Sequence, residues 1–215
     1  MSLFGVRRWP VTLRHGPITL RPLRLRDEDE WHSVRARNHA WTQPWDSTRP
    51  PEAEGPGITF AQMVATNRAE GRAGRALPWG IFWAEPGEPP RLAGQMTISG
   101  IAYGSARWAM AGYWVDSALA GRGIAPTALA LATDHCFGFL GLHRMEVAIR
   151  PENSKSLRVV EKLGFRLEGL RPAFMHVDGA WRDHLVYVLH AEEVGAGGVL
   201  ARLKGGAPGE VTDRS

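Results

Sequence analysis

A glycine-rich turn at residues 121–125 carries residue types that can bind phosphate. It follows the apolar residues 112–115 and reads Gly-Arg-Gly-Ile-Ala, and a run of strong helix formers begins at Thr127. Glycine allows close approach of the main chain and the positive φ values that such turns need. Pro126 is tolerated in a first helical turn, where unpaired N–H groups and the helix dipole attract anions. The turn therefore predicts a site for a pyrophosphate.

Three kinds of nucleotide or coenzyme site use such a turn, and the neighbouring residues discriminate between them. A P-loop requires a lysine after its last glycine, but no lysine follows Gly123 before Lys155. A dinucleotide fingerprint has a third glycine where this chain has Pro126, and it usually opens its fold, whereas this turn lies mid-chain. Both readings are disfavoured, so the third kind of site, a coenzyme A turn, remains to be tested against the residues that follow.

A second segment, residues 143–165, reads as a strand followed by a capped helix. Pro151 and Asn153 end the strand, and Asn153 or Ser154 can cap the helix. Apolar residues at 157, 160 and 163 give this helix one apolar face. Gly164 suits the position that follows a helix. The segment therefore predicts a strand, a sharp turn and an amphipathic helix.

Together the two segments resemble the GNAT N-acetyltransferases. The acetyl-CoA loop of that family reads Gln/Arg-x-x-Gly-x-Gly/Ala, which Gly123 and Ala125 match and Ala120 does not. In the second family signature, an Asn-x-x-Ser segment opens a helix that ends at Leu-Gly-Phe, as at residues 153–165. Residues 41–46 and 176–184 are similar to the ribosomal-protein-alanine (RimJ/RimL-type) branch, which acetylates protein N-termini. The resemblance covers roughly residues 12–190.

The resemblance implies acetyl-CoA as cosubstrate and no metal. The main chain of the strand before the turn is expected to contact pantetheine, and the amide of Val115 or a neighbour to polarise the thioester carbonyl. Asn153 is expected to contact the pantetheine amides or to cap its helix. The expected acetyl-CoA contacts are Trp114, Val115, Gly121, Arg122, Gly123, Ile124, Ala125, Thr127 and Asn153.

Two residues are candidates for acid–base chemistry. Ser156 lies one turn inside its helix, where serine has little intrinsic preference, and the family implies a proton donor to the coenzyme A sulfur there. Its hydroxyl can instead bond to a carbonyl of the preceding turn. Glu146 is the candidate base, although the family glutamate corresponds to Ala148. Competing candidates for the base are Asp178, Asp183 and His184.

The segment Trp-Thr-Gln-Pro-Trp-Asp at residues 41–46 is the candidate acceptor site. Trp41, Trp45 and Asp46 can hold a peptide N-terminus, whose amine seeks a negative partner. Equally, the two tryptophans can simply cover the core beneath a long loop.

Composition restricts the class of protein. The chain has 215 residues, 44% of them hydrophobic, enough for one core without a second domain. Its single cysteine, Cys136, cannot form an internal disulfide, and the N-terminus lacks the apolar core of a signal peptide, so we expect a cytoplasmic protein. The net charge is +4, yet charges alternate in sign, which indicates a solvated surface rather than a nucleic-acid site. No segment approaches the roughly 20 apolar residues that span a bilayer. We expect a monomer or a homodimer.

The elements that position these residues predict an α/β (α+β) fold. Strands are expected near residues 18–23, 79–84, 91–101, 107–116 and 185–189, and helices near 27–41, 59–72 and 124–141. In the GNAT-like fold, a mixed, mostly antiparallel sheet of about six to seven strands with about four helices holds acetyl-CoA at a splayed strand pair. The domain is expected to span residues 12–190, followed by a Gly-rich tail at 191–215 that is mobile or is ordered only by a neighbour.

The leading hypothesis is an acetyl-CoA-dependent N-acetyltransferase that acts by direct attack of a protein α-amine, plausibly that of a ribosomal protein, on the thioester. A second hypothesis is acetylation of a small amine, such as an antibiotic or a metabolite. Outside enzymes, the chain could be a non-catalytic acyl-CoA sensor or an RNA-associated factor.

Overall fold

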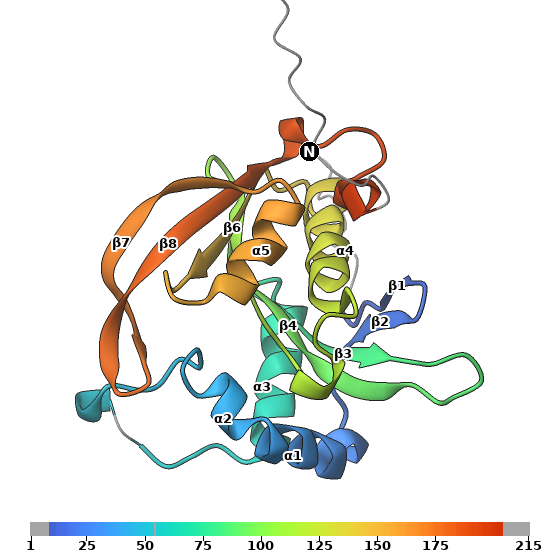
Figure 1. The fold of residues 1–215 in the computed structure, drawn as a ribbon, viewed down its shortest axis with the longest axis vertical. Helices are drawn as coiled ribbons and strands as arrows, with labels where there is room; N and C mark the ends of the chain where they lie inside the picture. Colours follow the sequence, from blue (N-terminus) through green and yellow to red (C-terminus); the bar gives the residue numbers. More distant parts are fainter. Residues whose placement is uncertain (1–8, 54, 204–215) are drawn as a thin grey trace, which may run out of the picture.

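The computed structural model describes residues 9–53 and 55–203, which form one mixed sheet flanked by helices (Figure 1). The sheet has eight strands in the order β1-β2-β3-β4-β5-β6-β8-β7, and every neighbouring pair is antiparallel except β5 and β6. The strands are β1 Leu13–His15, β2 Ile18–Arg21, β3 Leu77–Trp83, β4 Arg91–Ala102, β5 Trp108–Val115, β6 Arg144–Ile149, β7 Arg166–Val177 and β8 Ala180–His190. The α-helices are α1 Glu28–Arg37, α2 His39–Thr42, α3 Phe60–Arg72, α4 Ile124–Gly138 and α5 Ser154–Lys162.

Helices cover both faces of the sheet. On one face, α4 and α5 bury residues such as Leu129 and Val160 in the main core, together with Trp79 and Met96 from the strands. The core on the other face is smaller. It combines residues of α1, α3, β3 and β4 with a residue that follows β2: Val34, Phe60, Phe82, Leu92 and Leu23. Burial on both faces explains why β3 has no exposed residue and reads as a continuous apolar run.

The parallel pair β5 and β6 is joined along only part of its length. The ladder pairs Trp108 with Arg144, Ala109 with Met145 and Met110 with Glu146, and no pairing continues from Met110 to the end of β5 at Val115. The two strands therefore diverge toward their carboxyl ends. The prediction of a splayed strand pair is confirmed.

The predicted elements match most of the observed ones. Residue Thr59 caps α3 with its side chain, as expected for a helix beginning there, and β4 and β5 agree with their predicted ranges within one residue. The sheet has eight strands rather than six or seven. The strands without a prediction of their own are the two edge strands, β1 and β7. The pairing of β7 with β8 is irregular between Arg171 and Met175, around Pro172. Proline has no N–H to donate to a regular ladder, so within sheets it is found mainly at edges and irregularities such as this one.

The first part of the expected tail packs on the domain, so the prediction of a mobile segment is wrong for residues 191–203. Val199 is fully buried in the main core. The Asp134 carboxylate on α4 accepts hydrogen bonds from the main-chain N–H groups of Val199 (2.6 Å) and Leu200 (3.1 Å). The apolar side chains within residues 199–203 pack against the main core, whereas the surrounding glycines have no side chains to bury. The rest of the expected tail, 204–215, lies outside the described residues.

In the part of the chain that the structure describes, no helix has both the length and the apolarity needed to cross a membrane. The longest apolar helix, α4, has 15 residues, fewer than the roughly 20 that span a bilayer, and buries its side chains in the core.

Candidate functional site

The glycine turn has the geometry of an anion cradle. Gly121 (φ +82°) and Gly123 (φ +75°) both adopt the left-handed conformation, and a Cβ atom at either would meet no atom within 4 Å. Gly123 precedes α4 without a capping side chain, so the N–H groups of Ile124 and Ala125 have no partner within the helix. Open space in front of free N–H groups and a helix dipole suits a phosphate.

The main chain of β5 faces the splay at alternate residues. Asp116 N–H donates to Ala93 O on the β4 side (2.8 Å), so the peptide groups of Val115 and Tyr113 face the other side, where pairing with β6 has ended. The Val115 carbonyl there accepts a hydrogen bond from Trp41 Nε1 (3.1 Å). The Val115 N–H therefore faces a space in which a ligand can pair with it.

The splay, the turn and the first turn of α5 border one cleft of about 1020 Å³. This is the size of a site for a large ligand. Most of the predicted site residues line it, namely Trp41, Trp45, Asp46, Trp114, Val115, Gly121, Gly123, Ile124, Ala125, Asn153 and Ser156. The structure thus gathers the glycine turn, the Asn-x-x-Ser segment and the tryptophan segment, which are distant in sequence, around one space.

Two predicted ligand-binding residues are not among those that line the cleft. Arg122 turns toward the β3–β4 connection, where its guanidinium lies 3.7 Å from Glu85 and over the ring of Trp83. Thr127 is inside α4, where its N–H donates to Gly123 O (3.1 Å). Only the first residues of the helix reach the cleft, so a side chain one turn later faces elsewhere.

A row of basic residues on α5 was not identified from the sequence as part of the site. Lys155, Arg158 and Lys162 all line the cleft. Their spacing of three and four residues places them on one face of the helix, and that spacing was the signal available. Together with the α4 N-terminus they give this side of the cleft a positive potential, which suits the phosphates of a coenzyme A.

Ser156 and Tyr113 lie near each other, and both line the cleft. Asn153 Oδ1 accepts the Ser156 N–H (3.1 Å), so Asn153 caps α5, as one of its two predicted roles requires. The Tyr113 hydroxyl is buried without a hydrogen-bond partner among the described residues. Burial raises the pKa of the Tyr113 hydroxyl above its ordinary value, because a charged phenolate is poorly solvated there. Ser156 is thus placed beside the cleft with a phenol behind it.

The tryptophan segment forms another wall of the cleft, which touches the N-terminal end of α5. The Lys155 ammonium lies 3.6 Å from the centre of the Trp41 ring, and the Arg150 guanidinium lies 5.4 Å from that of Trp45. The Asp46 carboxylate is paired with Arg35 (2.6 Å). Asp46 lines the cleft and stays partly exposed, so an incoming amine would share this carboxylate with Arg35.

Glu146 does not line the cleft. It is buried, and its carboxylate bonds to Arg144 (2.8 Å) and Arg171 (3.0 Å). Both oxygens are thus held by guanidinium groups, which is typical of a structural ion-pair network. A catalytic role for Glu146 stays a prediction from the sequence.

The competing candidates for a base are held by structural contacts. Asp178 accepts from Gln43 Nε2 (3.0 Å), and Asp183 accepts from the Ala173 N–H (2.8 Å). His184 is buried and its Nδ1 donates to Arg182 O (3.0 Å). Burial lowers the pKa of His184, because a charged imidazolium is poorly solvated there.

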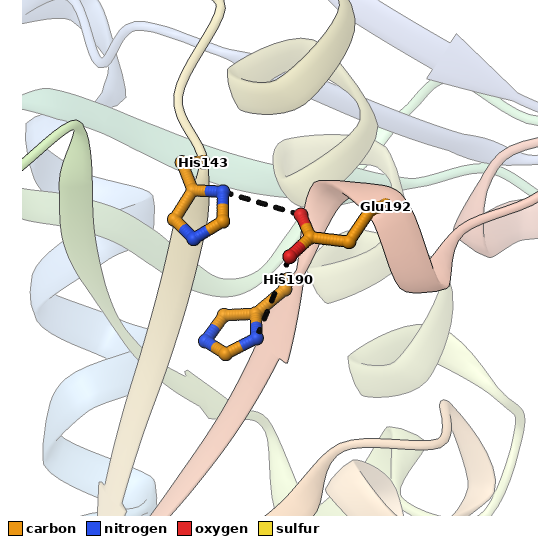
Figure 2. A group of neighbouring side chains, drawn as sticks. All are labelled: His143, His190 and Glu192. Carbon is orange, nitrogen blue, oxygen red and sulfur yellow. Dashed lines mark ion pairs between the residues drawn. The ribbon is translucent and has the colours of Figure 1, made fainter.

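A separate group of possible metal ligands lies at the other end of β6. This group comprises His143, His190 and Glu192, whose side chains Figure 2 shows as neighbours. Their ligand atoms all lie within 4.8 Å of one another. However, the two imidazole rings are stacked 5.0 Å apart at 14°, so their in-plane lone pairs do not converge on one point. His190 Nδ1 also lies 3.1 Å from Arg166 Nη2, which donates to it. A cation would have to displace that guanidinium and rotate a ring.

The residues present fit an acetyl-CoA. The cradle leaves space where phosphate must approach main-chain N–H groups, the α5 row supplies positive charge, and the splay exposes strand edges to pantetheine amides. The cleft continues past Val115 to the tryptophan wall. Such an arrangement can hold a thioester at the splay and admit a nucleophile along the tryptophan wall.

Comparisons with known proteins agree with this geometry. A model of the acetyltransferase (GNAT) domain matches residues 18–166. The chain is 31% identical over 182 residues to "Probable N-acetyltransferase YjcK" of Bacillus subtilis (82% of this chain, 96% of that protein). It is 27% identical over 167 residues to the "[Ribosomal protein uS5]-alanine N-acetyltransferase" of Escherichia coli (77% and 84%). The solved structure "Mycobacterium smegmatis RimJ in complex with CoA-disulfide" superposes with a TM-score of 0.80 at 38% identity, covering 91% of this chain and 94% of that one.

Proposed function

Because the chain belongs to the GNAT family of N-acetyltransferases, we propose that it acetylates the α-amine of a protein N-terminus, and that the protein is a ribosomal one. The observation that carries the proposal is the single cleft with two different walls. One wall has the glycine turn and the basic face of α5, and the other has Trp41, Trp45 and Asp46. The similarity to RimJ and to a ribosomal-protein-alanine acetyltransferase supports this acceptor class.

In the proposed complex, acetyl-CoA supplies the activated acetyl group, and this chain holds it and moves the protons. The N–H groups of Ile124 and Ala125 bind the pyrophosphate, and the strand edge at Tyr113 and Val115 pairs with the pantetheine. The Val115 N–H donates to the thioester carbonyl oxygen and so stabilises the negative charge that develops there.

The transfer is a direct attack. The neutral amine of the acceptor forms the new bond to the carbonyl carbon, the carbon–sulfur bond breaks, and the electron pair passes to the sulfur. Ser156 donates a proton to that thiolate and regains one from solvent. The proton that the amine loses passes to water, because Glu146, the candidate base from the sequence, does not line the cleft. We further propose that the enzyme is cytoplasmic, because its single cysteine cannot form the internal disulfides that are common in secreted proteins.

The test is a direct assay of the acceptor. Purified enzyme is incubated with acetyl-CoA and peptides that begin with Ala or Ser and contain an internal lysine, with N-terminally blocked copies as controls. The proposal expects one added acetyl group, placed on the α-amine by fragmentation mass spectrometry, and none on the blocked copies. Acetylation confined to spermidine or other small amines would instead support the second hypothesis, and binding of acetyl-CoA without turnover would support a sensor.

A further inference from the structure

Gln95 on β4 is held between two tryptophans. Trp31 Nε1 donates to Gln95 Oε1 at 2.9 Å, and Trp114 Nε1 donates to the same oxygen at 3.2 Å. An indole nitrogen is only a donor, so the amide atom between the two rings must be the oxygen. The chemistry of the contacts thus fixes which end of the carboxamide faces the indoles and which faces away.

The free end of this carboxamide belongs to the cleft. Gln95 lines the cleft together with Thr97 and Ser99, which follow on the same face of β4. Its partner across the ladder is Trp114, the neighbour of Val115. Among the described residues, no hydrogen bond from Gln95 Nε2 occurs, although its Oε1 accepts two. The site therefore presents an oriented N–H donor next to the strand edge expected to bind the thioester.

We infer that Gln95 Nε2 donates a hydrogen bond to the first peptide carbonyl of the acceptor, and so selects a peptide N-terminus over a simple amine. The inference rests on the proposed function. In a peptide, the first carbonyl is separated from the α-amine by a single carbon, so a donor beside the thioester can hold the carbonyl while the amine attacks. A polyamine has no carbonyl to offer.

The neighbouring residues fit this role. Thr97 pairs with Gly112, which has no side chain, so no side chain at that ladder position obstructs a peptide main chain beside Gln95. The Arg35 guanidinium lies 5.1 Å from the centre of the Trp114 ring and binds Asp46, which links the tryptophan wall to the residues that hold Gln95. A donor whose position is set by two rigid rings loses little entropy on binding its partner.

The experiment compares two acceptors and three enzymes. One acceptor is a peptide that begins with Ala, and the other is the same peptide with its first amide replaced by a trans alkene, which keeps the shape and removes the carbonyl. Gln95→Glu keeps an oxygen for both indoles and removes the N–H donors. Gln62→Glu, the control, adds the same charge at an exposed position where an oxygen already accepts the Thr59 N–H (2.8 Å).

The expected result is a preference of wild type and Gln62→Glu for the amide peptide of roughly 10- to 100-fold in kcat/KM, which falls to about 1 in Gln95→Glu. Affinity for acetyl-CoA, measured by calorimetry, should stay unchanged. If Gln95→Glu does not fold, Gln95→Met, of similar length and without a donor, replaces it.

Other outcomes overturn the inference in distinguishable ways. Wild type that acetylates both peptides equally well, or Gln95 variants that keep the full preference for the carbonyl, would refute the role of Gln95 and leave the proposed function standing. Wild type that acetylates neither peptide would refute both.

Discussion

The side chains of Asn38 and Asp116 meet at the end of β5, with Asn38 Nδ2 donating to Asp116 Oδ1 at 2.8 Å. Both residues are buried. Asn38 Oδ1 also accepts the Ser117 N–H (2.8 Å), and Arg37 donates to the other Asp116 oxygen (2.5 Å). Asn38 joins α1 to α2, which leads to the tryptophan wall, and Asp116 leads from β5 to the glycine turn. This contact therefore fixes the two walls of the cleft relative to each other.

Asp116→Asn should destabilise the fold in a pH-dependent way. Burial alone would raise the pKa of Asp116, but hydrogen bonds from Arg37 and Asn38 outweigh it and hold that pKa below its ordinary value. A lowered folded-state pKa stabilises the protein above the unfolded pKa of about 3.9, and this contribution is lost as the pH falls through the folded value. We expect a loss of about 2 kcal/mol at pH 7 that shrinks below about pH 4.

Urea unfolding at a series of pH values measures this effect, with the exposed Glu52→Gln variant as control. Equal stability of Asp116→Asn and wild type at pH 7 would contradict the prediction.

Gly123→Val should abolish acetyl-CoA binding, lowering affinity by about 100-fold or more. The branched side chain would fill the space in front of the cradle N–H groups and block the pyrophosphate. Gly104→Val is a matched control, since Gly104 has a similar φ of +76° and equally open surroundings but does not line the cleft. Calorimetry measures both variants. Unchanged affinity in Gly123→Val would rule out the phosphate turn.

Ser156→Ala should lower kcat by about 10- to 1,000-fold with little change in acetyl-CoA affinity, as expected when a proton donor to the thiolate is removed. Asn153 still caps α5 in this variant, because it accepts from the main-chain N–H of residue 156. Steady-state kinetics and calorimetry separate the two effects. Normal turnover would make Ser156 a structural residue.

Replacing Trp45 and Asp46 together by alanine should raise the KM for the peptide steeply and leave acetyl-CoA affinity and hydrolysis nearly unchanged. Both residues line the acceptor wall rather than the cradle. Asp46→Asn alone separates the charge from the aromatic surface. A folded double variant with full peptide activity would place the acceptor site elsewhere and favour the small-amine hypothesis.

Glu146→Gln distinguishes a structural glutamate from a base. Since Arg144 and Arg171 hold both oxygens and the residue does not line the cleft, we expect a loss of stability of about 2 kcal/mol and a change in kcat below about threefold. Thermal unfolding and a pH–rate profile are the measurements. A fall in kcat above about 100-fold, with loss of the acidic limb of the profile, would instead establish Glu146 as the base.

Local residue chemistry was enough to predict the central elements of the fold. The helix at α3 has its cap at Thr59, and β4 and β5 lie within one residue of their predicted ranges. In contrast, β7 has no apolar alternation, because as an edge strand it leaves most of its residues exposed. The burial of Val199 depends on α4, which lies more than 60 residues earlier, and no local pattern reveals such a contact.

The candidate site was predictable where function depends on the main chain. The glycines at 121 and 123 predicted a turn with positive φ values, and both residues have them. Likewise, Asn153 was predicted as a possible helix cap and caps α5. Side-chain roles were harder to predict because they depend on partners from other elements. Arg122 pairs with Glu85 and so turns away from the cleft. The orientation of the Gln95 carboxamide depends on a hydrogen bond from Trp31, a residue 64 positions away.

The short ladder between β5 and β6 also affects how resistant the protein is to proteolysis. Only three residue pairs join these strands, and a cosubstrate lodged where they diverge adds contacts to both sides. A ligand that binds only the native state raises the free energy of unfolding by RT ln(1 + [L]/Kd), about 2.7 kcal/mol at one hundred times Kd. Resistance to cellular proteases should therefore rise and fall with the acetyl-CoA supply, so that a starved cell loses this enzyme faster than a fed one.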